Sequence, residues 1–291
     1  MDLQLSPILR QELLDLVSKR TSLITHLNSL RTLVLGSSHG DFGFNPAFVP
    51  ESFNLCSPSQ DLRHSYLLYE KLCDLNPTIR NIVVFYSAFS PGHRIEMTSE
   101  KEKCAALKEV FLLDSEYDDP EILAAHASIA GRLADMRLER GYRGFIRTNG
   151  GPFFEPGYGA DRRAAGHMKH NGRRVEDFHL IRLILAAQAR GQKVLIVIPP
   201  ARSDYKAALR RLSNDIFRSL REITGYAFRE PVRVLDCFDD FSFSDDLFGD
   251  FDHLLPEGPG AAILSTRILN CLEDRPHGFP GSPTPPAAPT A

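Results

Sequence analysis

The chain has 291 residues, with 34 lysines and arginines against 37 aspartates and glutamates. Neither sign of charge is collected into a long run, which argues against a nucleic-acid-binding protein and against binding to an anionic membrane surface. The five cysteines are widely spaced and form no CxxC pair, so the sequence predicts neither a disulfide framework nor a metal site. A chain of this length can bury a substantial core, and we expect one large α/β domain.

The start of the chain gives no targeting signal. It mixes Asp2 and Gln4 with apolar residues, whereas a secretory signal places a basic region before an apolar run. No stretch of about 18 consecutive apolar residues occurs, so no membrane span is expected. Together these features predict a cytoplasmic location.

A helix and then a series of short strands are predicted along the chain. Ser6 and Pro7 precede leucines at helical spacing, which predicts a helix within residues 1–30 that packs on or beside the domain, or binds a protein partner. Apolar runs then predict strands, most of them separated by helical patterns, as parallel strands require. The predicted strands are residues 32–35, 52–55, 82–86, 194–198 and 232–235, and helices are predicted at residues 62–75, 205–223 and 260–272.

These elements predict the fold class of residues 31–273. Strands that alternate with helices form a parallel sheet with right-handed crossovers and helices on both faces. We therefore expect an α/β three-layer sandwich with a five-stranded parallel sheet. Residues 274–291 are dominated by Pro, Gly, Ala, Ser and Thr, which predicts a disordered tail.

More than a hundred residues separate the third and fourth predicted strands, so this stretch must carry structure of its own. Long ordered loops on a rigid scaffold commonly carry binding groups, and we interpret this insertion as a lid or a substrate-recognition element. The alternative is an insertion without a role. It covers about residues 93–190, with helical patterns at 99–113, 120–139 and 175–190, a loop rich in glycine and aromatic residues at 141–158, and a basic polar stretch at 161–174.

The basic stretch of the insertion holds a dense set of polar and cationic side chains. Such groups bind carboxylates and phosphates, which predicts a site for a carboxylated sugar, a phosphate or the phosphate of a cofactor. The alternative is a solvated loop that binds no ligand. The candidate substrate-binding residues are Arg162, Arg163, His167, Lys169 and Asn171.

Two motifs are expected to meet at the carboxyl edge of the sheet. The sequence LGSSHG at residues 35–40 closes the first strand, and DFDH at residues 250–253 precedes the last helix. A serine hydroxyl becomes a nucleophile when an imidazole accepts its proton and a carboxylate orients that imidazole. We assign these three roles to Ser38, His253 and Asp250.

Two neighbours of these residues are given other roles. Asp252 is adjacent to the histidine and is expected to point away from it, because the three-residue offset of Asp250 suits the contact better. His39 follows the serine and is expected to fix the loop rather than act as the base.

The serine and histidine motifs resemble those of the SGNH or GDSL-like hydrolases. The resemblance spans most of residues 31–272 apart from the insertion, and it implies a flavodoxin-like fold in which Ser38 is the nucleophile and Asp250 and His253 complete a triad. The start LGSSH is similar to divergent members associated with bacterial surface polysaccharides, many of them esterases or acyltransferases on sugars. The resemblance is carried by residues 35–39, 53–61, 83–87 and 250–254 and by Gly260.

The blocks that would hold the oxyanion depart from that family. The second block usually offers a glycine amide, and Ser59 stands near that place here. The third block usually carries Gly-x-Asn-Asp, whereas residues 87–92 read SAFSPG and lack the asparagine. Removing one oxyanion donor costs about 2.7 to 4 kcal/mol of transition-state stabilisation, so another group must substitute. The candidate donors are Ser38, Ser59 and Ser87.

The motifs and the resemblance together predict a serine esterase or O-acyltransferase that acts on an acylated carbohydrate and so modifies a polysaccharide. Hydrolysis needs no cofactor, whereas a transferase would take an acyl donor such as acetyl-coenzyme A. The alternative is a catalytically silent relative that binds a glycan or a protein partner through the insertion. The missing asparagine supports this alternative, and the joint presence of Ser38, Asp250 and His253 argues against it.

Overall fold

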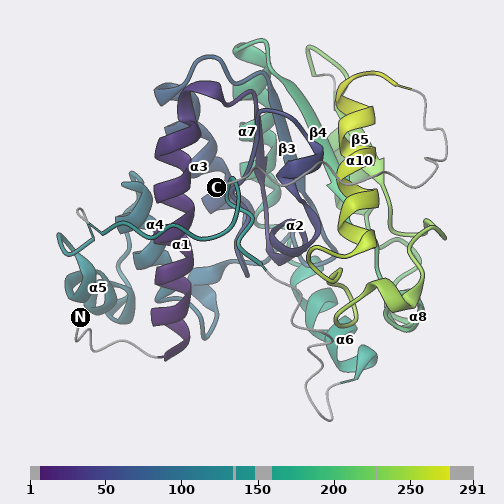
Figure 1. Ribbon diagram of the computed structural model, residues 1–291. Coiled ribbons are helices and arrows are strands. Elements are labelled where there is room, and N and C mark those ends of the chain that lie inside the picture. Colours follow the sequence, from purple (N-terminus) through teal and green to yellow (C-terminus); the bar gives the residue numbers. More distant parts are fainter. Residues whose placement is uncertain (1–6, 134–135, 148–158, 227, 276–291) are drawn as a thin grey trace.

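The apolar runs of the sequence form a five-stranded sheet in the computed structural model (Figure 1). The structure describes residues 7–133, 136–147, 159–226 and 228–275. All neighbouring strands are parallel, in the spatial order β2-β1-β3-β4-β5, and the sheet confirms the predicted fold class. The strands are β1 (Thr32–Leu35), β2 (Ser52–Asn54), β3 (Asn81–Phe85), β4 (Lys193–Ile198) and β5 (Arg233–Asp236).

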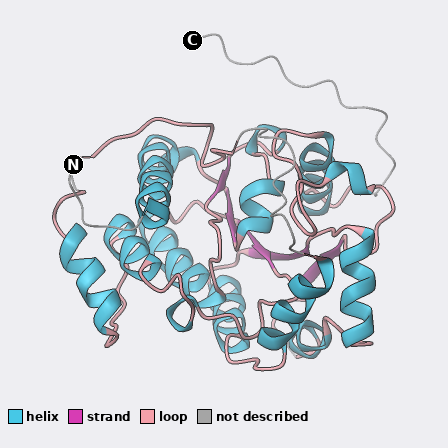
Figure 2. Ribbon diagram, turned by 90° about the horizontal axis from the view of Figure 1, so that it is seen from below, coloured by secondary structure: helices cyan, strands magenta, loops and turns pink. Residues whose placement is uncertain are grey.

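Alternate residues of the strands point to opposite faces of the sheet, and both faces are covered. Leu33 and Leu35 belong to one hydrophobic cluster, and Val34 between them belongs to the other. In the same way Val83 and Val84 lie in different clusters. Strands buried on both faces read as continuous apolar runs, which is why they are visible in the sequence. Figure 2 shows the helices on either side of the sheet.

Ten α-helices lie within the described residues. One hydrophobic cluster contains residues of α1, α3, α4, α7 and α8, and the other contains residues of α10. The helices are α1 (Pro7–His26), α2 (Ser38–Gly43), α3 (Leu62–Leu75), α4 (Lys103–Phe111), α5 (Pro120–Ile129), α6 (Ala160–Asn171), α7 (Asp177–Ala189), α8 (Ser203–Leu212), α9 (Arg218–Thr224) and α10 (Pro259–Leu272).

The basic polar stretch predicted at residues 161–174 is the largest difference from the sequence analysis, because most of it forms helix α6. Its apolar residues that pack inward are few, with Ala164 buried and Met168 partly buried, and polar side chains lie beside them, so no broad apolar stripe marks it as a helix. Arg163, His167 and Asn171 follow one another at intervals of four residues, which places them on one face. The stretch is therefore a helix that packs against α8.

Two other predicted helices have different bounds. The pattern at residues 205–223 is divided into α8 and α9 by a turn in which the amide of Asp215 donates to Ser213 Oγ. The helix predicted at residues 120–139 ends ten residues early, at Ile129. Apolar spacing continued across both breaks, so periodicity alone did not reveal them.

The N-terminal helix α1 packs against α4 and buries Leu13, Leu16 and Val17. No helix within the described ranges is both long enough and apolar enough to cross a membrane. The tail predicted at residues 274–291 lies outside the described residues from residue 276 onward, as does most of the loop predicted at 141–158.

Candidate functional site

The serine motif forms a tight turn between β1 and α2. Gly36 has φ +135°, and a side chain there would place its Cβ 2.7 Å from Phe85 Cβ on the neighbouring strand. The chain can therefore turn at this point only with glycine or with a shift of β3. Ser38 is the first residue of α2, so the turn sets its hydroxyl at the carboxyl edge of the sheet.

The histidine motif lies on the loop before α10 and reaches the same edge. His253 Nε2 lies 2.7 Å from Ser38 Oγ, and His253 Nδ1 lies 2.7 Å from Asp250 Oδ2. The other oxygen of Asp250 accepts the backbone amides of Asp252 and His253. The three residues that the sequence analysis placed together thus form one hydrogen-bonded chain, with the carboxylate fixed by its own loop.

The carboxyl of Asp250 is held in its charged form. Burial by itself opposes the charge, but the attraction and hydrogen bond of His253 outweigh it and lower the pKa of Asp250 below its ordinary value. His253 is buried between two rings: its centroid is 5.3 Å from that of Phe42 and 4.9 Å from that of His39. These contacts fix the plane of the imidazole, which a general base requires.

A second polar network, formed by Asp252, His39 and Ser37, lies next to the hydrogen-bonded residues Ser38, His253 and Asp250. Asp252 is 2% exposed, and its Oδ2 is 3.1 Å from His39 Nε2. His39 Nδ1 in turn lies 3.1 Å from Ser37 Oγ. Asp252 therefore faces His39, but it stays close to the imidazole of His253, with 3.7 Å between Asp252 Oδ1 and His253 Nδ1. The expectation that Asp252 points away was wrong in this respect, because the loop turns both carboxylates inward.

Helix α6 brings three of the five candidate substrate-binding residues into the protein. Arg163 Nη2 is 3.0 Å from Asp252 Oδ1, and His167 Nδ1 contacts the hydroxyl of Tyr205. Asn171 Nδ2 donates to the carbonyls of residues 88 and 216. The remaining two candidates, Arg162 and Lys169, lie on the exposed side of the helix. The four-residue spacing of Arg163, His167 and Asn171 in the sequence indicates that these three share one face of a helix.

The candidate oxyanion donors differ in what already binds them. Ser38 N–H lies in the first turn of α2, where amides have no helical partner. Ser59 is in the left-handed region with φ 56°, and its carbonyl lies 3.0 Å from His93 Nε2. The amide of Ser87 donates to Ser90 Oγ, so an oxyanion would compete with that bond. That these three serines donate hydrogen bonds to an oxyanion stays a prediction.

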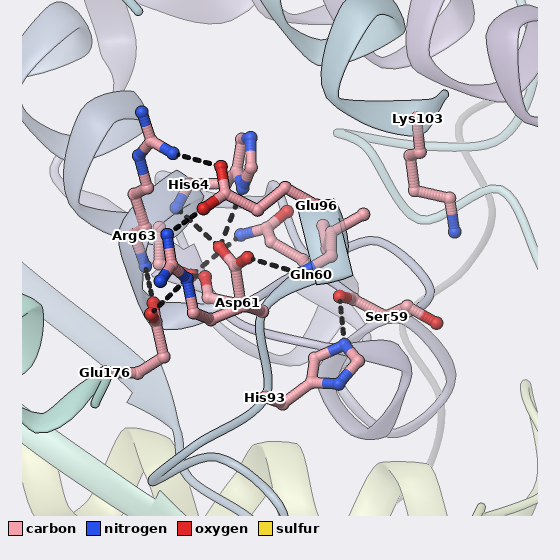
Figure 3. Close-up of polar contacts among 12 residues, drawn as sticks. Ser59, Gln60, Asp61, Arg63, His64, His93, Glu96, Lys103 and Glu176 are labelled. Atoms are coloured by element: carbon pink, nitrogen blue, oxygen red, sulfur yellow. Dashed lines mark hydrogen bonds and ion pairs between the residues drawn. The ribbon is translucent and has the colours of Figure 1, made fainter. Parts of the chain in front are cut away.

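The loop that carries Ser59 is anchored by a buried cluster around Asp61 (Figure 3). The carboxylate of Asp61 caps α3 through the amide of His64, pairs with the His64 ring at 2.7 Å and accepts the amide of Ile95. Burial opposes both charges of this pair, yet their attraction lowers the pKa of Asp61 and raises that of His64. The cluster ties this loop to the segment after β3.

Glu176 is a buried carboxyl beside this cluster, and we expect it to reduce stability at neutral pH. Burial, with a contribution from the charge of Asp61, raises its pKa to about 7. The folded state therefore takes up a proton that the unfolded state releases near pH 4.5, so stability falls as the pH rises from about 4.5 to 7. Glu176→Gln should raise the free energy of unfolding by about 2 kcal/mol at pH 8 and leave it nearly unchanged at pH 4.5.

Urea unfolding of the native chain and the variant at the two pH values measures this difference. Glu121→Gln is the matched control, because Glu121 is exposed and pairs with Lys101. It should change stability by less than about 0.5 kcal/mol at either pH. Equal effects of Glu176→Gln at both pH values would show that the carboxyl titrates normally.

One group of metal-ligating side chains gathers in the part of the chain that the structure describes. Ligand atoms of His39, Asp252 and His253 all lie within 4.8 Å of one another. The guanidinium of Arg163, 3.0 Å from Asp252, already supplies a positive charge at this place. A cation would be repelled by it, so the geometry favours an ion-pair network over a metal centre.

Comparison with known proteins adds little to this geometry. No protein-family model matches the chain, and no curated protein is significantly similar to it in sequence. A solved structure from Streptococcus pneumoniae, provisionally described as a platelet activating factor, is similar with a TM-score of 0.45 and 12% identity, and covers 90% of this chain and 94% of that one. Such a distant likeness assigns no family, so the function is argued from the site.

Proposed function

We propose that the protein is a serine esterase or O-acyltransferase of the SGNH type. The observation that carries this proposal is the hydrogen-bonded chain from Ser38 through His253 to Asp250, with 2.7 Å at each link. Such an arrangement lets the imidazole accept the hydroxyl proton while the carboxylate holds its tautomer and stabilises its cation.

The reaction begins when Ser38 Oγ attacks the carbonyl carbon of an ester and its proton passes to His253 Nε2. The tetrahedral intermediate collapses as the bond to the leaving alkoxide breaks, and His253 gives the proton to that oxygen. The acyl group is now bound to Ser38. Water, or a sugar hydroxyl in a transferase, then loses its proton to His253 and attacks the acyl carbon. The bond from that carbon to Ser38 Oγ breaks, His253 returns the proton to Ser38 Oγ, and the free acid or the new sugar ester leaves.

An acylated carbohydrate is the proposed substrate. Support comes from the likeness of LGSSH to polysaccharide-associated relatives and from Arg162 and Lys169, two exposed cationic side chains on the helix that reaches the site through Arg163. Cationic groups suit an acidic sugar or, in a transferase, the phosphates of acetyl-coenzyme A.

The binding-protein alternative has one specific observation in its favour. The third block lacks the asparagine that would donate to an oxyanion, and the amide of Ser87 is already bonded to Ser90. A site that holds a triad without enough oxyanion donors would bind a glycan without cleaving it.

Acetate release from O-acetylated saccharides separates the two proposals. The native chain should release acetate from at least one acetylated saccharide, and Ser38→Ala should release none. Ser244→Ala is the control, because Ser244 is an exposed serine between β5 and the histidine motif. Acetyl-coenzyme A added with an unacetylated saccharide tests transfer by formation of the sugar ester. Saccharide binding without acetate release or transfer would favour the binding protein.

A further inference from the structure

His253 faces two carboxylates rather than one. Its Nδ1 is 2.7 Å from Asp250 Oδ2 and 3.7 Å from Asp252 Oδ1, and Asp252 is almost entirely removed from solvent. Negative charge at this distance favours the protonated imidazole. A protonated Nε2 cannot accept the proton of Ser38, so a second full negative charge here would work against the base.

The charge of Asp252 is compensated from helix α6. Arg163 Nη2 lies 3.0 Å from Asp252 Oδ1, while His39 Nε2 and His167 Nδ1 lie 3.1 and 3.7 Å from Oδ2. Burial lowers the pKa of both His39 and His167, so at neutral pH these rings are neutral. Arg163 is then the permanent positive charge that faces Asp252 among the described residues.

Two further guanidiniums lie beyond the groups that face His253: Arg147 lies over the ring of Phe42, and Arg202 lies over the ring of Phe251 and interacts with the charge of Asp250. Ser38 and His39 face His253 from α2, together with the ring of Phe42, and Asp250 and Asp252 face it from its own loop. From α8, Tyr205 reaches the network through His167.

We propose that Arg163 is a positioning residue of the active site: by pairing with Asp252 it offsets the negative charge that lies beside His253, the group that must accept the Ser38 proton. This inference rests on the proposed serine chemistry. It gives the insertion a role in catalysis, because an arginine that lies about ninety residues from the histidine in sequence compensates the charge beside it. It also assigns Arg163 to the protein's own carboxylate rather than to a substrate.

The test is the pH dependence of the rate at which a fluorophosphonate labels Ser38, measured between about pH 5 and pH 9. Arg163→Met should move the midpoint of this rate upward by about one pH unit, because an uncompensated Asp252 favours the imidazolium. Asp252→Asn should move the midpoint downward, since it removes the negative charge and leaves Arg163 unpaired. In the double variant Arg163→Met, Asp252→Asn the midpoint should return toward the native value. Arg163→Lys keeps the positive charge, so its midpoint should stay close to the native one.

Arg211→Met is the matched control. Arg211 lies on α8 and pairs with Asp161 of α6 at the surface, so its loss removes an ion pair to the same helix without touching the network. The midpoint of the pH dependence of labelling in Arg211→Met should equal that of the native chain.

A purely structural role of Arg163 would lower the labelling rate at every pH without moving the midpoint, and that result would overturn the inference. If Arg163→Met fails to fold, the downward shift of Asp252→Asn and the near-native midpoint of Arg163→Lys still decide the question. Absence of any label on the folded native chain would instead contradict the proposed function itself.

Discussion

His253→Ala is expected to lower the rate at which Ser38 attacks an ester by about 10⁴- to 10⁶-fold. The imidazole is the group that lies 2.7 Å from Ser38 Oγ, so the variant leaves the hydroxyl without a base. His253 is buried against the rings of His39 and Phe42, and its loss creates a small cavity but removes no backbone support. Hydrolysis of an activated acetate ester, with thermal unfolding measured in parallel, checks the effect.

His126→Ala provides the control for this experiment. His126 is a partly exposed histidine on α5 that pairs with Glu109, far in sequence from both motifs. It should hydrolyse the ester at the native rate. A His253→Ala rate within about tenfold of the native rate would mean that another group accepts the proton.

Lys19→Met is expected to lower the free energy of unfolding by about 3 to 5 kcal/mol. Lys19 is 1% exposed, and its ammonium lies 2.8 Å from the carboxylate of Asp41, which is fully buried. It also donates to the carbonyls of Asn54 and Gly144, so all three of its N–H groups have partners. Methionine has a similar shape but leaves a buried carboxylate and two carbonyls without this donor.

The pKa of Asp41 gives this prediction its pH dependence. Burial opposes the charge of Asp41, but Lys19 and Arg147 outweigh it and lower the pKa below the ordinary value. The native pair therefore adds stability above the unfolded pKa of about 4, and this stability is lost as the pH falls through the lower folded pKa. The difference between Lys19→Met and the native chain should shrink at acidic pH.

Urea unfolding of the variant, at neutral and at acidic pH, measures both effects. Lys101→Met is the matched control, because the ion pairs of Lys101 with Asp119 and Glu121 lie near the surface. It should cost less than about 1 kcal/mol. The double variant Lys19→Met, Asp41→Asn should be more stable than the sum of the single losses, since it removes both charges of the pair while Arg147 keeps its ion pair with Asp15. If Lys19→Met lowers the free energy of unfolding by less than about 1 kcal/mol, the buried ion pair of Lys19 with Asp41 does not stabilise the fold as proposed.

The strands could be predicted from sequence because of where they are buried. The inner strands β1, β3 and β4 are covered on both faces and read as apolar runs, and the edge strands β2 and β5 lie at the positions of the other two predicted runs, although β5 is mostly exposed. The six-residue helix α2 escaped prediction, since it is too short to show a helical period. Helix α6 escaped for a different reason: its one buried residue is the small Ala164, and the polar Arg163, His167 and Asn171 beside it are partly buried by partners distant in sequence.

The candidate site likewise has one part that could be predicted from the sequence and one part that could not. The placement of Ser38 and of residues 250–253 at one sheet edge follows from the order of strands and helices, and it brings these side chains within hydrogen-bonding distance. The contact between Arg163 and Asp252 depends on how α6 packs against α8, and no local pattern specifies that packing. Pairings of this kind become visible only in three dimensions.

The central claim is that Ser38 is a nucleophile activated by His253, and intact mass after fluorophosphonate treatment tests it most directly. We predict one adduct on the native chain and on Ser244→Ala, none on Ser38→Ala, and labelling of His253→Ala slowed by several orders of magnitude. No adduct on the folded native chain, or an adduct that persists on Ser38→Ala, would contradict the claim.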